Sequence, residues 1–213
     1  YKVTRNMLHM TGDTGAFLRT TMGALVLFGV PPEEYWPYKA ADYEKEPSAF
    51  CDAFPRNYQA ISYYRLDPPG KKKEDLLKQI KTNLACGLPS MFGFTVYSSY
   101  DQAEKTGKIP FPTKGEKTVG GHAIVAAGYD DKMKITNTHR GAKGTTGALL
   151  IRNSWGTGWG DRGYGWLPFD YVLQGLADES WGLDNVQVAV APVPVPPAVW
   201  LFGSGLIGAF GVA

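Results

Sequence analysis

Cysteine and histidine are scarce in this chain, with two cysteines and three histidines among 213 residues. The cysteines, Cys51 and Cys86, form no CxxC pair, and His9, His122 and His139 are widely spaced. Zinc sites use cysteine and histidine ligands at short, regular spacings, so we expect neither a metal nor another cofactor. Each cysteine is interpreted as a buried thiol or as one half of a disulfide with sequence outside this chain.

A strong excess of charge of one sign is also lacking. The net charge at pH 7 is +2, and the one dense basic run, at residues 71–73, directly precedes a predicted helix. Nucleic-acid binding requires a concentrated basic face, so nucleic acid is not an expected partner. The composition, 44% hydrophobic and 20% charged, is typical of a folded globular protein with one large domain or two small ones.

Two helices are predicted before most of the strands. The first spans residues 17–28, with Asp13 or Thr14 as its capping residue and Gly29 as its stop. An irregular stretch rich in aromatic and acidic residues follows to about residue 55. The second helix begins at residue 73 and ends before Gly87; its apolar face consists of Leu76, Leu77, Ile80 and Leu84.

Strand patterns dominate the second part of the chain. A first strand is predicted within residues 60–66, and alternating apolar residues indicate further strands in 90–100, 120–130, 147–155 and 164–172. Helices come first and strands later, which favours an α+β class with segregated parts over repeated βαβ units.

The most informative residues are His122, in "GGHAIVAAGYD", and Asn153, in "LLIRNSWGTGWG". If the two strands are adjacent, the asparagine oxygen can accept one imidazole N–H, fix the tautomer and leave the other ring nitrogen for a nucleophile. Trp155 could cover this bond and keep water out. Taken alone, the histidine could be an ordinary surface or core residue and the asparagine an ordinary turn residue. The order of the two motifs favours the base half of a Cys-His-Asn site.

Both motifs resemble those of papain-like cysteine peptidases, of the cathepsin-related type found in bacteria. "GGHAIVAAGYD" resembles the histidine block of that family, "IRNSWGTGWGDRGYGWLP" its asparagine block, and "TGDTGAFLRTTMGALVLFGV" the segment after its catalytic helix. The resemblance covers roughly residues 10–183. It implies a two-lobed α+β fold, with a helical lobe and an antiparallel β-barrel-like lobe, and a peptide or protein as substrate.

The same resemblance implies roles for individual residues. His122 would be the base, Asn153 would orient it, and Trp155 would shield the pair. Gly15 would hydrogen-bond the main chain of the substrate. The pocket for the residue two before the cleaved bond would be lined by Gly93, Gly121 and Ala123.

One departure from the family is an insertion between the two motifs. The segment "DKMKITNTHRGAKGTTG" is longer than in plant and animal relatives. We interpret it as a surface insertion between two paired strands, with His139 exposed.

The second departure concerns the nucleophile. In the family this is a cysteine at the start of a long N-terminal helix, preceded by a glutamine that stabilises the oxyanion. Cys51 and Cys86 come after the position where the nucleophile belongs, and neither has the Gly-x-Cys setting. We therefore expect a fragment that lacks the N-terminal catalytic helix and is itself inactive. The alternative is a catalytically inactive papain-like protein that binds peptides at the cell surface.

The predicted organisation is a helical lobe in residues 1–59, a β-barrel-like lobe in 60–185, a Pro-rich linker in 186–197 and a hydrophobic segment in 198–213. "VPVPPAVWLFGSGLIGAFGVA" resembles a PEP-CTERM sorting signal of Gram-negative bacteria. That resemblance implies export, transient membrane anchoring and processing by an exosortase-like enzyme. The formal GxGxxG within it, "GSGLIG", lacks a preceding strand and a downstream acidic residue, which argues against dinucleotide binding.

Overall fold

A sheet of six strands organises the part of the chain that the computed structural model describes, residues 1–184. Its strands are β1 (Ser62–Arg65), β2 (Ser90–Tyr97), β3 (Thr118–Ile135), β4 (Thr145–Arg152), β5 (Tyr164–Pro168) and β6 (Ala177–Asp184). Their order across the sheet is β1-β6-β2-β3-β4-β5, and every neighbouring pair is antiparallel. The predicted α+β class is confirmed. The predicted linker and sorting segment lie outside the described residues.

Five α-helices and three short 3-10 helices complete the described part. They are α1 (Lys2–Met7), α2 (Leu18–Leu27), α3 (Ala49–Ala53), α4 (Lys73–Ala85) and α5 (Phe169–Leu173), with η1 (Ala40–Asp42), η2 (Phe54–Tyr58) and η3 (Ser98–Ala103). The two predicted helices are confirmed as α2 and α4. The stretch expected to be irregular contains α3, which forms because the Ser48 hydroxyl accepts the Cys51 N–H at 3.3 Å and caps the helix.

The predicted capping residue of the first helix is wrong. Phe17, in an extended conformation, is the N-cap of α2, and no side chain caps that helix. Asp13 instead accepts the Tyr1 hydroxyl at 2.5 Å, and Thr14 accepts a bond from Arg5 at 3.3 Å. Gly29 does follow the end of α2, with a φ of +76° that favours glycine.

The main hydrophobic core lies between the sheet and the helices α4 and α5. On α4, Leu76 and Ile80 are buried, and Leu77 and Leu84 pack against the same core, as their spacing predicts. On β2, the alternating Phe92 and Phe94 point into it. A second, smaller cluster joins α2 to the sheet, where Leu18 and Met22 contact Leu25, Tyr63 and Met91.

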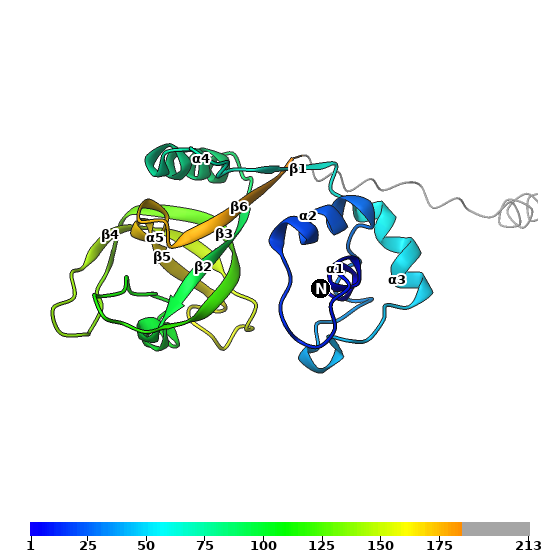
Figure 1. Cartoon of the computed structure of the whole chain (residues 1–213), viewed down its shortest axis with the longest axis horizontal. Helices are drawn as coiled ribbons and strands as arrows, with labels where there is room; N and C mark the ends of the chain where they lie inside the picture. The colour runs from blue at the N-terminus through cyan, green and yellow to red at the C-terminus, as the bar shows by residue number, and fades with distance from the viewer. Residues whose placement is uncertain (185–213) are drawn as a thin grey trace, which may run out of the picture.

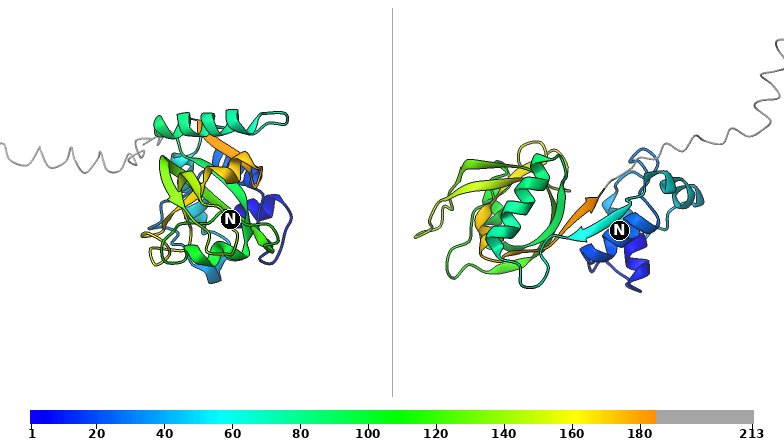
Figure 2. Two further views of the ribbon diagram at one scale, coloured as in Figure 1. Left: turned by 90° about the vertical axis from the view of Figure 1, so that its left-hand side faces the viewer. Right: turned by 90° about the horizontal axis from the view of Figure 1, so that it is seen from above.

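The sheet and the N-terminal helices occupy separate ends of the molecule. Figure 1 shows α1, α2 and α3 together in one lobe, and β2 to β5 with α5 in the other. The antiparallel β1–β6 pair runs from one lobe to the other, and the view from above in Figure 2 shows this clearly. Helix α2 packs on β1, β2 and β6, so the helical lobe is attached to one edge of the sheet.

The predicted insertion extends the β3–β4 hairpin. Ile135 pairs with Thr145, and residues 136–144 form the connecting loop. His139, on this loop, is exposed as predicted. The loop is anchored by Asn137, whose Nδ2 donates to Glu116 Oε1 at 2.8 Å. The loop lies at the end of the hairpin opposite to the one that carries His122 and Asn153.

Candidate active site

The register of β3 and β4 brings His122 and Asn153 together. Val125 pairs with Arg152, the last residue of β4, so Asn153 leaves that strand beside the part of β3 that contains His122. Asn153 Oδ1 lies 2.9 Å from His122 Nε2, and Asn153 is buried with 3% of its surface exposed. The structure therefore joins two residues separated by 31 positions, as the sequence motifs predicted.

The surrounding hydrogen bonds fix the tautomer of the histidine. The backbone N–H of Ser154 donates to Asn153 Oδ1 at 2.8 Å, and a backbone N–H can only donate, so the atom facing it is the oxygen. His122 Nε2 must then carry the proton that this oxygen accepts. In the neutral ring Nδ1 keeps its lone pair, and within residues 1–184 it has no hydrogen-bond partner. Nδ1 is therefore available as a base.

Tyr100 holds the other end of the Asn153 amide, and no sequence motif pointed to it. Asn153 Nδ2 donates to the Tyr100 hydroxyl at 3.2 Å. Burial raises the pKa of Tyr100 to about 12, while the hydrogen bond from Asn153 opposes this shift. The hydroxyl consequently stays protonated near neutral pH and accepts the Asn153 N–H without a charge of its own.

Aromatic rings surround the pair. The Trp155 ring lies 4.9 Å from the His122 ring between centroids, and the Phe94 ring lies 5.9 Å away on the other strand. Trp155 also contacts Tyr100 and Trp159 edge to face. Since 54% of Trp155 is exposed, the indole covers the histidine from one side and presents its other side to solvent.

The predicted pocket residues lie on one face of the sheet. Gly93 pairs with Ala123, and Gly121 with Thr95, while the neighbouring Phe94 and Ile124 point into the core. A side chain at Gly121 would meet no atom within 4 Å. Beyond Gly93, on β6, lies Asp178, whose carboxylate would be 3.5 Å from a Cβ at Gly93. Their role in a substrate pocket stays a prediction.

Gly15 lies in a turn of the helical lobe and has a φ of +83°. Its N–H donates to the Tyr1 hydroxyl at 3.2 Å, and its carbonyl accepts from Arg5 at 2.9 Å. Both main-chain groups of Gly15 therefore have partners within the chain. Its predicted contact with substrate main chain stays a prediction, and Arg5 is a residue that sequence reasoning missed.

Neither cysteine lies in this constellation. Cys51 is a buried free thiol whose sulfur lies 3.6 Å from the Tyr35 carbonyl oxygen, in the helical lobe. Cys86, the C-cap of α4, is a free, exposed thiol. Burial, one of the two interpretations offered for Cys86, is wrong because its helix end faces solvent.

Residues 1–184 contain neither a cluster of metal ligands nor a helix that could span a membrane. Among these residues no three side chains of histidine, cysteine, aspartate or glutamate gather as metal ligands would. Within the same range no helix has the length and apolarity needed to cross a membrane.

Comparison with known proteins shows that the chain is similar to cysteine proteases. The sequence profile of the papain family cysteine proteases matches residues 7–177. The crystal structure of xylellain, a cysteine protease from Xylella fastidiosa, is 32% identical, covers 87% of this chain and 69% of its own, and superposes with a TM-score of 0.67. Among curated proteins, an uncharacterized peptidase C1-like protein of Acanthamoeba polyphaga mimivirus is 29% identical over 178 residues, which are 82% of this chain and 53% of that protein.

A more distant match is the cathepsin B-like cysteine proteinase 5 of Caenorhabditis elegans, 29% identical over 164 residues, which are 74% of this chain and 40% of the relative. The chain thus spans about half or less of the length of these curated relatives.

Proposed function

This chain belongs to the papain family of cysteine proteases, and we propose that it supplies the base-carrying part of a peptidase that cleaves peptide bonds by a Cys-His-Asn mechanism. The observation that supports this most directly is the 2.9 Å bond between His122 Nε2 and Asn153 Oδ1. With Nε2 protonated, Nδ1 can accept the proton of a thiol placed beside it.

In the proposed reaction, His122 Nδ1 takes the thiol proton and the thiolate attacks the carbonyl carbon of the scissile bond. The resulting imidazolium lowers the thiol pKa below its free value of about 8.5. The tetrahedral intermediate collapses, His122 gives its proton to the leaving amine, and an acyl-enzyme remains. Water then attacks the thioester while His122 accepts its proton. The carboxylic acid leaves and the thiol is regenerated.

The nucleophilic cysteine and the oxyanion-stabilising glutamine are proposed to lie in sequence that precedes this chain. The environments of the two cysteines support this. The Cys51 thiol faces a backbone carbonyl in the helical lobe, and Cys86 borders the outer face of α4.

The test uses the complete reading frame that contains this chain. We expect thiol-dependent hydrolysis of fluorescein-labelled casein, lost on alkylation with iodoacetamide and reduced at least about 100-fold by His122→Ala. Cys51→Ser and Cys86→Ser serve as matched controls and should keep the activity, and residues 1–213 alone should have none. Loss of activity in either cysteine control would refute the assignment. Peptide binding without cleavage, with Ser, Ala or Gly at the nucleophile position, would favour the inactive binding protein.

Export is a separate proposal that rests on the sequence of residues 193–213. We propose that they act as a PEP-CTERM-like signal which anchors the protein transiently in the membrane of a Gram-negative bacterium until an exosortase-like enzyme processes it. Fractionation of cells that express the protein with and without these residues tests this. Release of both forms at equal rates and equal length would contradict it.

A further inference from the structure

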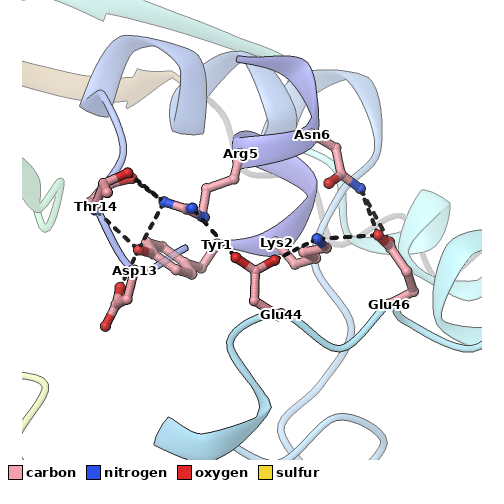
Figure 3. Close-up of polar contacts among 9 residues, drawn as sticks. Tyr1, Lys2, Arg5, Asn6, Asp13, Thr14, Glu44 and Glu46 are labelled. Atoms are coloured by element: carbon pink, nitrogen blue, oxygen red, sulfur yellow. Dashed lines mark hydrogen bonds and ion pairs between the residues drawn. The ribbon is translucent and has the colours of Figure 1, made fainter. Parts of the chain in front are cut away.

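Arg5, on α1, is a fully buried arginine, with 0% of its surface exposed. Its Nη1 donates to the Gly15 carbonyl at 2.9 Å and lies 3.3 Å from both the Thr14 hydroxyl and the Tyr1 hydroxyl. Figure 3 shows the guanidinium directed at Thr14 and Tyr1, with Glu44 on the opposite side. One buried cation therefore donates hydrogen bonds to two adjacent residues of the helical lobe, Thr14 and Gly15.

The charge of Arg5 has a partner at longer range. Its Nη2 lies 3.6 Å from Glu44 Oε1, while Glu44 Oε2 binds Lys2 at 2.7 Å. The bond from Lys2 is the main reason why the pKa of Glu44 is lowered. Nε and Nη2 of Arg5 have no hydrogen-bond partner within residues 1–184. Burying an arginine whose N–H donors are only partly paired costs free energy of folding. A role in stabilising the fold alone therefore does not explain why Arg5 is buried.

Hydrogen bonds with Arg5 and Tyr1 hold both main-chain groups of Gly15, its carbonyl and its N–H. The Tyr1 hydroxyl accepts the Gly15 N–H at 3.2 Å and itself donates to Asp13 at 2.5 Å. Gly15, at a φ of +83°, has open space where a Cβ would stand. The side chains of Arg5 and Tyr1 thus hold the turn of residues 13–16 on one side. On the side where a Gly15 Cβ would stand, no atom lies within 4 Å.

Ala16, the residue after Gly15, has free main-chain groups. Among the described residues, neither the N–H nor the carbonyl of Ala16 has a hydrogen-bond partner, and the next residue, Phe17, is extended. Main-chain N–H and C=O groups that are free in this way can pair with the main chain of an extended peptide, as those of a strand edge do. We propose that Arg5 is a positioning residue that holds the turn of residues 13–16 in place for the main chain of a peptide. The proposal rests on the proposed function in taking peptides as the ligand.

The experiment uses the complete protein and two variants that remove little volume. Arg5→Lys keeps the charge but loses the planar group that reaches three acceptors, and Thr14→Val removes one of those acceptors. We measure KM and kcat on a fluorogenic peptide, and the Kd for fluorescein-labelled oxidised insulin B chain after the active thiol is blocked with methyl methanethiosulfonate. Arg5→Lys should raise KM and Kd about 10-fold and Thr14→Val about 3-fold, since charge-assisted bonds are stronger than neutral ones. The kcat and the rate of thiol alkylation by iodoacetamide should stay within about twofold in both.

Leu76→Ala is the matched control for destabilisation, because Leu76 is 1% exposed in the core of the other lobe. It should lower Tm without raising KM or Kd. Unchanged KM and Kd in folded Arg5→Lys and Thr14→Val, or an equal rise in Leu76→Ala, would overturn the role of Arg5. A wild-type protein that binds the insulin chain with Arg5-dependent Kd but does not cleave peptides would refute the proposed function and keep this inference. A wild-type protein that does neither would refute both.

Discussion

Replacing Asn153 with alanine tests the geometry on which the proposed chemistry depends. The side chain of Asn153 makes three hydrogen bonds, to His122, Tyr100 and the Ser154 N–H. Tyr100 is 7% exposed and would keep an unpaired hydroxyl, which costs about 1–3 kcal/mol, while the two partners nearer to solvent cost about 0.5–1.5 kcal/mol each. We therefore expect the free energy of unfolding to fall by about 2–6 kcal/mol and Tm by about 4–24 °C.

The effect on the reaction has a different origin. Once the Oδ1 acceptor is gone, nothing holds the proton on His122 Nε2 or aims Nδ1 at the thiol. A hydrogen bond to a charged group contributes about 1.5–3 kcal/mol, and the imidazole is charged in the proposed transition state, so kcat/KM should fall about 10- to 150-fold.

The assay measures kcat/KM and the rate of iodoacetamide alkylation of the complete protein well below its Tm. Asn137→Ala is the matched control, because Asn137 is also buried and also bonds through its amide, to Gln102, Phe111 and Glu116. It should lose stability and keep the reaction rate. A rate within twofold of wild type in Asn153→Ala, or an equal slowing in Asn137→Ala, would refute the reasoning.

Three further changes test other parts of the structure. Trp155→Ala should cost little stability, since the ring is 54% exposed, but should slow hydrolysis about fivefold as water reaches the His122–Asn153 bond; an unchanged rate would remove Trp155 from the site. Burial opposes ionisation of Glu116, but hydrogen bonds from Ser99, Thr113 and Asn137 outweigh it and lower its pKa to about 2. The stability this carboxylate contributes is therefore present above its ordinary pKa of 4.5 and lost as the pH falls towards 2. Thermal melts from pH 7 to 2 should show a smaller acid loss in Glu116→Gln than in wild type, and parallel curves would contradict this. In Gly29→Ala the new Cβ would stand 1.9 Å from the Pro55 carbonyl oxygen, so urea unfolding should show a loss above about 3 kcal/mol. Gly12→Ala, with a similar φ and open space, should lose only about 1–2 kcal/mol, and equal losses would refute the role of the contact.

Local periodicity was enough to predict most of the elements that position the site. The alternation of Phe92 and Phe94 predicted β2, and the spacing of Leu76 and Ile80 predicted α4, because each pattern reflects burial of one face. The His122–Asn153 pair could be predicted because His122 lies in one strand motif and Asn153 directly follows the other. When the two strands pair, residues at matching positions come close together.

The remaining features depend on contacts between segments that share no local pattern. Asp13 and Thr14 looked like capping residues, but tertiary partners, Tyr1 and Arg5, take their side chains. Tyr100 reaches Asn153 across 53 positions and is not distinguished by its neighbours in sequence. The exposure of Cys86 depends on which side of the α4 C-terminus faces solvent, and spacing alone does not determine that.

Because the Asn153 side chain is uncharged, it can orient the His122 imidazole but cannot supply the counter-charge of the imidazolium. A carboxylate at this position would orient the imidazole too, but its negative charge would also attract the imidazolium whether or not a thiol is present. A carboxamide, held by Tyr100 and the Ser154 N–H, fixes the tautomer with no net charge. The counter-charge of the protonated ring must then come from the thiolate itself, so ionisation of the nucleophile and of His122 is one coupled step. On this reasoning Asn153→Asp should uncouple them, and the pH profile of thiol alkylation in the complete protein would shift. An unshifted profile would show that the absence of charge on Asn153 does not matter for ionisation of the thiol.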